Sequence, residues 1–165
     1  MTASENRVAL VTGSALGIGA AIAEQLARDG MTVLVSDLNE AEAGRTAARF
    51  REQGFAAEPL ELDVSDPASI AAAFAVVGNR FGRCDVVVNN AGIAKTFPFL
   101  DFPLDNFAAT MAVNVTGTLL CAQRTAQLMV PRGGDGSSTS PPSPACAPWA
   151  MDAPLTARRR LPSSG

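Results

Sequence analysis

The chain has 165 residues, of which 47% are hydrophobic, and its formal net charge is -3. This length is enough for one domain with a core of its own, and the negative charge argues against a nucleic-acid-binding surface. The sequence contains no histidine and no tyrosine, which excludes acid–base catalysis by either side chain.

The cysteines and the apolar runs restrict the cellular context that we expect. Cys84, Cys121 and Cys146 are far apart, and their spacing matches neither a metal site nor a disulfide framework. Residues 1–7 lack the apolar stretch of a leader peptide, and no apolar run approaches the length of a membrane span. We therefore expect a cytoplasmic protein with neither a membrane nor a nucleic acid as its partner.

Residues 8–19 read VALVTGSALGIG and predict a buried strand, a glycine turn and the start of a helix. Glycines in such a turn allow a sharp bend, a close approach of the backbone to a phosphate and close packing of the helix on the strand. The free N–H groups at the helix start then face an anion. The segment therefore predicts a phosphate-binding turn.

Strand-like and helix-like segments alternate along the first 130 residues. After the first strand and a helix at 18–28, the pattern predicts strands at 32–36, 57–62 and 85–89, helices ending near 53 and 81, and a long helix over 104–129. Runs this apolar indicate a parallel sheet covered by helices on both faces. The predicted fold class is therefore α/β, a Rossmann-like doubly wound sheet with strand order 3-2-1-4 and the fourth strand at an edge.

Asp37 follows the second strand, 18 residues after Gly19. A carboxylate at this position can accept hydrogen bonds from both hydroxyls of an adenosine ribose, and it would repel a 2′-phosphate. The local pattern is equally compatible with a cap for the next helix, formed by Asp37 or by Asn39.

The motifs, taken in order, resemble the short-chain dehydrogenase/reductase family over residues 7 to about 130. They are T-G-x-x-x-G-x-G at 12–19, Asp63-Val64 after the third strand, Asn89-Asn90-Ala91-Gly92 after the fourth, and Asn114 in the long helix. The resemblance implies an NAD(P)-dependent oxidoreductase that transfers a hydride between an alcohol or carbonyl substrate and NAD.

The resemblance also implies a role for each matching residue. Those that would bind the cofactor are Gly13, Ser14, Gly17, Ile18 and Gly19 at the pyrophosphate, Asp37 in selecting NAD over NADP, Asp63 and Val64 at the adenine, and Asn90, Ala91 and Gly92 near the nicotinamide ribose. Asn114 matches the asparagine that supports a proton-relay water in the family. Its alternative interpretations are an exposed helix asparagine or one bonded to a neighbouring carbonyl.

The chain departs from the family after the long helix. The family continues with a fifth strand that ends in a catalytic serine and with a Tyr-x-x-x-Lys helix, whereas this chain has no tyrosine and its only lysine is Lys95. We therefore expect a truncated, inactive member with an incomplete homo-oligomer interface. The alternatives are a catalytically silent nucleotide-binding module that partners an intact homologue, and a non-functional translation product.

Residues 131–165 contain seven of the eleven prolines and show no period, so we expect a cofactor-binding domain at 1–130 followed by a disordered tail. A shifted reading frame offers one explanation for this tail. The shifted frame admits an apolar strand with serines over 136–143, and a Tyr-x-x-x-Lys pattern over 155–160. We hypothesise the loss of one nucleotide, or the gain of two, near codons 134–137; the DNA sequence tests this.

Overall fold

The computed structural model describes residues 7–130, so the predicted tail and the frameshift hypothesis lie outside the described residues. Strands and helices alternate as predicted. The elements are β1 (Val8–Thr12), α1 (Gly17–Arg28), β2 (Thr32–Asp37), α2 (Glu40–Glu52), β3 (Ala57–Glu61), α3 (Pro67–Phe81), β4 (Val86–Val88), the 3-10 turn η1 (Phe99–Asp101), α4 (Leu104–Met111), the π-helical turn η2 (Ala112–Gly117) and α5 (Thr118–Met129).

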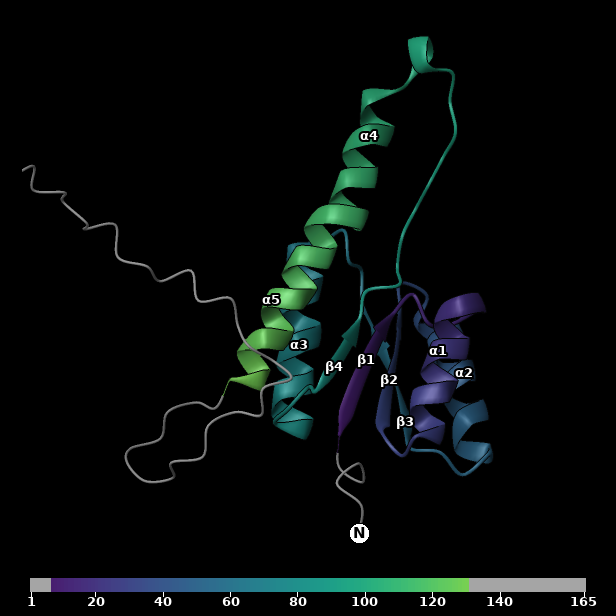
Figure 1. The fold of residues 1–165 in the computed structure, drawn as a ribbon, viewed down its shortest axis with the longest axis vertical. Coiled ribbons are helices and arrows are strands. Elements are labelled where there is room, and N and C mark those ends of the chain that lie inside the picture. Colours follow the sequence, from purple (N-terminus) through teal and green to yellow (C-terminus); the bar gives the residue numbers. More distant parts are fainter. Residues whose placement is uncertain (1–6, 131–165) are drawn as a thin grey trace, which may run out of the picture. The chain divides into compact units, whose positions relative to one another are not determined.

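The four strands form one parallel sheet in the order β3-β2-β1-β4, which confirms the predicted topology (Figure 1). Val11 at the centre of the sheet pairs in register with Val35 of β2 and with Val88 of β4. Within residues 7–130, β4 pairs on one side only, with β1. β4 is therefore the edge strand that the sequence predicts for the described part of the chain.

Alternate residues of the strands face two separate cores, because successive side chains of a strand point to opposite faces of the sheet. On one face, Val11, Val33 and Val35 pack against alanines of α1 and α2 and against Phe50. On the other face, Val8, Leu10 and Leu34 pack against α3 and α5. Figure 1 shows this layering, with α1 and α2 on one side of the sheet and α3 and α5 on the other.

The helix ends show how local sequence sets the boundaries. Of the two capping candidates for α2, the structure uses Asn39, whose side-chain oxygen accepts a hydrogen bond from the Glu42 N–H at 3.2 Å. Asp66 caps α3 in the same way, directly before Pro67 at the first helical position. Gly82 ends α3 in the left-handed conformation.

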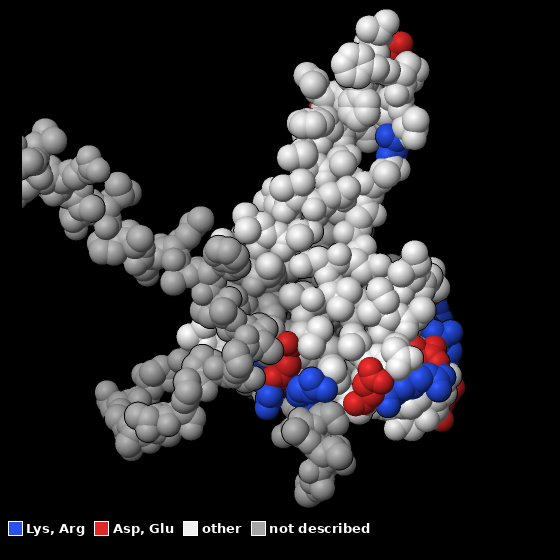
Figure 2. Space-filling view, in the orientation of Figure 1, with Lys and Arg blue, Asp and Glu red and all other residues white. Residues whose placement is uncertain are grey.

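The long helix predicted over 104–129 differs from the structure in one respect: the π-helical turn η2 interrupts it over six residues, including Asn114. Such turns are rare and frequently lie at functional sites. In Figure 1, α4 extends beyond the carboxyl ends of the strands, and the surface over it carries few charges in Figure 2. No helix within residues 7–130 has the length and apolar character that a membrane span requires.

Candidate cofactor-binding site

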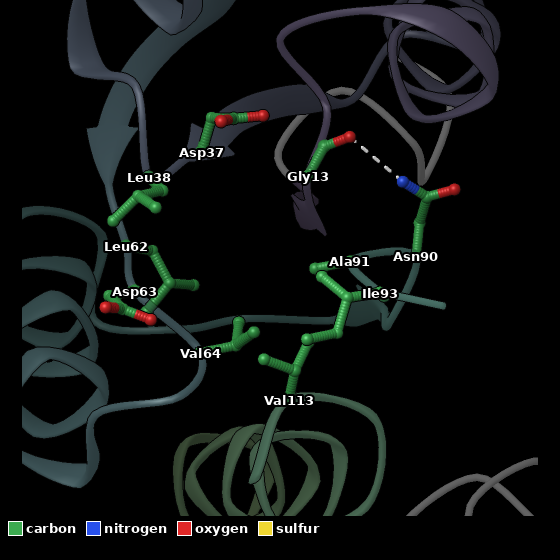
Figure 3. Close-up of a pocket in the computed structure, with 11 residues that line it drawn as sticks. Gly13, Asp37, Leu38, Leu62, Asp63, Val64, Asn90, Ala91, Ile93 and Val113 are labelled. Atoms are coloured by element: carbon green, nitrogen blue, oxygen red, sulfur yellow. Dashed lines mark hydrogen bonds between the residues drawn. The ribbon is translucent and has the colours of Figure 1, made fainter. Parts of the chain in front are cut away.

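A cavity of about 260 Å³ lies at the carboxyl ends of the strands (Figure 3). The chain leaves β1 toward β2 on one side, and β4 lies on the other side, so this is the point where the strand order reverses. Ligands of open α/β sheets bind at such points. The lining residues come from the loops after all four strands and from η2: Gly13, Asp37, Leu38, Leu62, Asp63, Val64, Asn90, Ala91, Gly92, Ile93 and Val113.

Close packing requires glycine at two positions, Gly13 in the turn after β1 and Gly19 in the first turn of α1. Gly13 adopts a left-handed φ of 62°, and a Cβ there would lie 3.0 Å from the Cα of Ala91. A Cβ on Gly19 would overlap the carbonyl oxygen of Gly13 and lie 2.5 Å from the Nδ2 of Asn90. These positions therefore let α1 and the loop after β4 meet at the end of β1.

Gly17 has a different environment, because a Cβ built on it would meet nothing within 4 Å, although its φ is 60°. It begins α1, whose N-cap Leu16 makes no side-chain cap hydrogen bond and whose first turn contains no acidic residue. The first N–H groups of a helix lack partners inside the helix and carry its positive dipole end. Gly17 and Ile18 are exposed, so the free N–H groups at the start of α1 are accessible to an anion, whereas Gly19 is buried.

Ser14, which the sequence predicts at the pyrophosphate, lies inside the protein. Its side chain is completely buried, and its hydroxyl donates to the Val11 carbonyl at 2.7 Å and accepts from the Ser36 N–H at 3.0 Å. Its own N–H donates to the Ser36 carbonyl at 2.9 Å. Ser14 therefore joins the ends of β1 and β2 with both of its donors used inside the protein, and its contact with the pyrophosphate stays a prediction.

Thr12 contributes to the site in a way that the sequence pattern alone did not reveal. Its Oγ1 accepts hydrogen bonds from the N–H groups of Asn90 at 3.1 Å and Ala91 at 3.0 Å. In return, the Nδ2 of Asn90 donates to the carbonyls of Thr12 at 3.0 Å and Gly13 at 2.9 Å, the latter drawn in Figure 3. These bonds fasten the loop after β4 to the glycine turn. The Thr12-Gly13 pair in the motif was the signal that could have revealed this role.

Asp37 lies at the end of β2 with its carboxylate at the edge of the cavity (Figure 3). Its Oδ2 accepts a hydrogen bond from the Ala15 N–H at 3.2 Å, and its Oδ1 accepts one from the Asn39 N–H at 3.1 Å. Each oxygen keeps further acceptor capacity. Leu38 follows with its side chain 67% exposed and completes this wall of the cavity.

Asp63 and Val64 come from the loop after β3 and line the cavity. The Oδ1 of Asp63 accepts from both the N–H and the hydroxyl of Ser65, at 2.8 and 2.6 Å. Gly117, which the sequence pattern did not single out, lets the long helix approach this loop, because a Cβ there would overlap the Val64 carbonyl oxygen.

Asn114 contacts the loop after β4 from the π-helical turn. Its Oδ1 accepts from the Ile93 N–H at 2.9 Å, and its Nδ2 donates to the Ile93 carbonyl at 2.8 Å. Both alternative interpretations describe the side chain, because Asn114 is exposed and is also bonded to a neighbouring carbonyl. Its support of a proton-relay water stays a prediction. Val113, next to it, lines the cavity.

Residues 7–138 match the family model described as short chain dehydrogenase, so the chain belongs to the short-chain dehydrogenase family. Among its relatives, D-threitol dehydrogenase of Mycolicibacterium smegmatis is 40% identical over 130 residues, which cover 79% of this chain and 50% of that protein. Sorbitol dehydrogenase of Cereibacter sphaeroides is 39% identical over 132 residues, covering 80% of this chain and 50% of that protein.

A solved structure supports the same fold. The gluconate 5-dehydrogenase from Burkholderia cenocepacia, in complex with NADP and tartrate, matches with a TM-score of 0.72 and 41% identity. The match covers 76% of this chain and 49% of that one. The chain thus belongs to a family of oxidoreductases that bind a nicotinamide dinucleotide, and it spans about half the length of the curated relatives it matches.

Proposed function

We propose that this chain is the dinucleotide-binding part of an NAD(P)-dependent oxidoreductase and that the cavity at the strand ends holds the cofactor. The observation that carries the proposal is the uncapped start of α1, where the first N–H groups have no cap and a Cβ on Gly17 would meet no protein atom within 4 Å. A bound dinucleotide would supply or accept the hydride.

The residues around the cavity suggest how the cofactor would lie. Its pyrophosphate would rest on the backbone of Gly13, Gly17, Ile18 and Gly19. Its adenine would contact Asp63, Val64 and Leu38, and its nicotinamide ribose would lie beside Asn90, Ala91 and Gly92. This placement agrees with the way Thr12 and Asn90 hold the two loops against each other.

We further propose that Asp37 favours NAD over NADP. Its carboxylate lies at the cavity edge with acceptor capacity for ribose hydroxyls, and a 2′-phosphate there would be repelled. The related gluconate 5-dehydrogenase has NADP bound, so cofactor preference requires a measurement on this chain.

For the chemical step, we propose that Asn114 supports the site by holding the loop after β4 through Ile93. Its carboxamide has no proton to give at ordinary pH, and the sequence contains no tyrosine or histidine. We therefore expect cofactor binding without turnover. Relatives described as threitol and sorbitol dehydrogenases favour a polyol substrate for a protein in which this part is joined to a catalytic part.

The test is to titrate the full chain with ADP-ribose and, separately, with NAD. Binding is monitored through the NMR signals of the protein's backbone amides. Because the contacts are mainly with the adenosine and pyrophosphate, we expect both ligands to bind with a Kd of about 1 mM. The largest signal changes should occur at Gly17 and Ile18. Absence of binding would refute the proposal, and turnover of a secondary alcohol would refute the expected lack of activity.

A further inference from the structure

Thr46 is a buried polar residue that the proposed cofactor contacts do not include. It lies on α2, the residue is 6% exposed, and its hydroxyl donates to the Ala15 carbonyl at 2.6 Å. The two residues are 31 positions apart, so this hydrogen bond joins α2 to the glycine turn. A buried carbonyl that lost this partner would be left unsatisfied, which is costly.

Ala15 is held from both sides of its Cα. The peptide group before it donates its N–H to the Oδ2 of Asp37 at 3.2 Å, and the peptide group after it offers its carbonyl to Thr46. The residue itself is buried, with 3% of its surface exposed. Side chains from β2 and α2 together therefore fix the backbone of the turn at this position.

The peptide group that Thr46 holds also carries the N–H of Leu16. All peptide bonds of the described residues are trans, so this N–H points opposite to the carbonyl and away from Thr46. It has no hydrogen-bond partner among residues 7–130. It is followed in the chain by the free N–H groups that begin α1.

We propose that Thr46 is a positioning residue of the cofactor site. It sets the orientation of the Ala15–Leu16 peptide, so that the Leu16 N–H adds to the row of donors facing the pyrophosphate. By the same contact it keeps Ala15 in place to bond Asp37, which steadies the carboxylate beside the ribose. This inference rests on the proposed function.

The experiment compares four full-length proteins: the wild type, Thr46→Val, Thr46→Ser and the control Thr125→Val. Thr125 is also a buried helical threonine, but its hydroxyl donates at 2.8 Å to the Cys121 carbonyl of its own helix. The Kd for ADP-ribose is measured by NMR titration at a temperature where circular dichroism shows each protein folded. Hydrogen exchange of the Ala15 amide is measured without ligand.

We expect Thr46→Val to bind ADP-ribose about tenfold more weakly and its Ala15 amide to exchange faster, because one buried hydrogen bond is lost. Thr46→Ser keeps the hydroxyl and should stay within about threefold of the wild type. Thr125→Val should match the wild type in both measurements. If Thr46→Val fails to fold, Thr46→Ala removes the same hydroxyl with less crowding and takes its place.

Unchanged affinity in Thr46→Val would overturn the proposal, and so would an equal loss in the valine and serine variants, because only the hydroxyl is held responsible. If the wild type itself fails to bind ADP-ribose, the proposed function is wrong. Exchange of Ala15 then still reports on Thr46: an unchanged rate in the valine variant would show that the hydroxyl does not position the turn.

Discussion

The carboxamide of Asn114 makes two hydrogen bonds to the backbone of a single residue, Ile93, at 2.9 and 2.8 Å. This pairing joins the π-helical turn to the loop after β4, two segments that are 21 positions apart. It places Val113 and Ile93 together on one side of the cavity. The long helix is therefore connected to the cavity through Asn114, the residue for which the family resemblance implies a role in proton relay.

Asn114→Leu should lower the free energy of unfolding by about 1–3 kcal/mol, because each of the two lost hydrogen bonds contributes about 0.5–1.5 kcal/mol. Denaturant unfolding provides the measurement. Asn106→Leu is the control, since its carboxamide makes no hydrogen bond among residues 7–130. Equal stability of the two variants would contradict a structural role for the Ile93 pairing.

Asp37→Asn should reduce the preference for NAD over NADP. The wild type should favour NAD, since repulsion of a 2′-phosphate at contact distance is about 1 kcal/mol in water and about 4 kcal/mol at an intermediate dielectric. The amide has no charge, while its oxygen still accepts one of the two backbone hydrogen bonds. The ratio of the two dissociation constants is the measurement.

Asp63→Asn is the control for that experiment. Asp63 also lines the cavity, but its Oδ1 is occupied by Ser65, and we place it at the adenine, which is the same in both cofactors. Its substitution should change the two affinities by the same factor. If the wild type binds both cofactors equally, the proposed role of Asp37 is wrong.

Periodicity and turn residues predicted the strands and most helix boundaries of this fold, and the topology rules for parallel sheets predicted the strand order. Apolar periodicity reports which side chains are buried. In this fold the strands are buried on both faces and each helix of the two layers on one, so the pattern distinguishes them. The candidate cavity was also predictable, since its location follows from the strand order. The helix cap was narrowed to Asp37 or Asn39, and only the structure shows that Asn39 performs it.

The polar contacts were less predictable because they depend on register between distant segments. Ser14 follows the glycine of the motif, yet its side chain turns into the core and bonds Ser36. The hydroxyls of Thr12 and Thr46 form hydrogen bonds with backbone groups that are 78 and 31 positions away in the sequence. The π-helical turn spans only six residues, which is too short for its different period to appear in the apolar pattern.

The buried thiols should make stability sensitive to alkaline pH. Burial, helped by the negative charge of Asp85, raises the pKa of Cys84 to about 11, and burial raises the pKa of Cys121 to about 11 as well. In an unfolded chain a thiol ionises near its ordinary pKa of 9.0. Below that pH both states hold their protons. Between pH 9 and 11 the unfolded state loses them first, so the free energy of unfolding should fall as pH rises.

Few other groups obscure this effect, because the chain has no tyrosine and its only lysine is Lys95. Denaturant unfolding at pH 8 and at pH 10.5 is the measurement. Cys121→Ala should reduce the fall in the free energy of unfolding between pH 8 and pH 10.5, even if the substitution lowers stability at pH 8. A pH dependence unaffected by Cys121→Ala would contradict this account.

Gly17 and Gly19 should respond differently to alanine. A Cβ on Gly19 overlaps the Gly13 carbonyl and crowds Asn90, both of which are held in place, so Gly19→Ala should destabilise the fold strongly. A Cβ on Gly17 meets no protein atom, and the left-handed φ of 60° costs only about 1–2 kcal/mol. Gly17→Ala should therefore stay folded at low temperature but bind ADP-ribose weakly, because its methyl group occupies the space in front of the α1 N–H groups.

Gly44→Ala is the matched control. Gly44 lies inside α2, and a methyl group there would meet no other atom within 4 Å, so alanine should stabilise the protein by roughly 0.5–1 kcal/mol and leave ligand affinity unchanged. Thermal unfolding and an ADP-ribose titration of the three variants separate the two roles. Full affinity in a folded Gly17→Ala protein would mean that the open space at the start of α1 is not where the pyrophosphate lies. A fully stable Gly19→Ala protein would mean that α1 can withdraw from β1 without cost, which would contradict the close packing of Gly19 on Gly13 and Asn90.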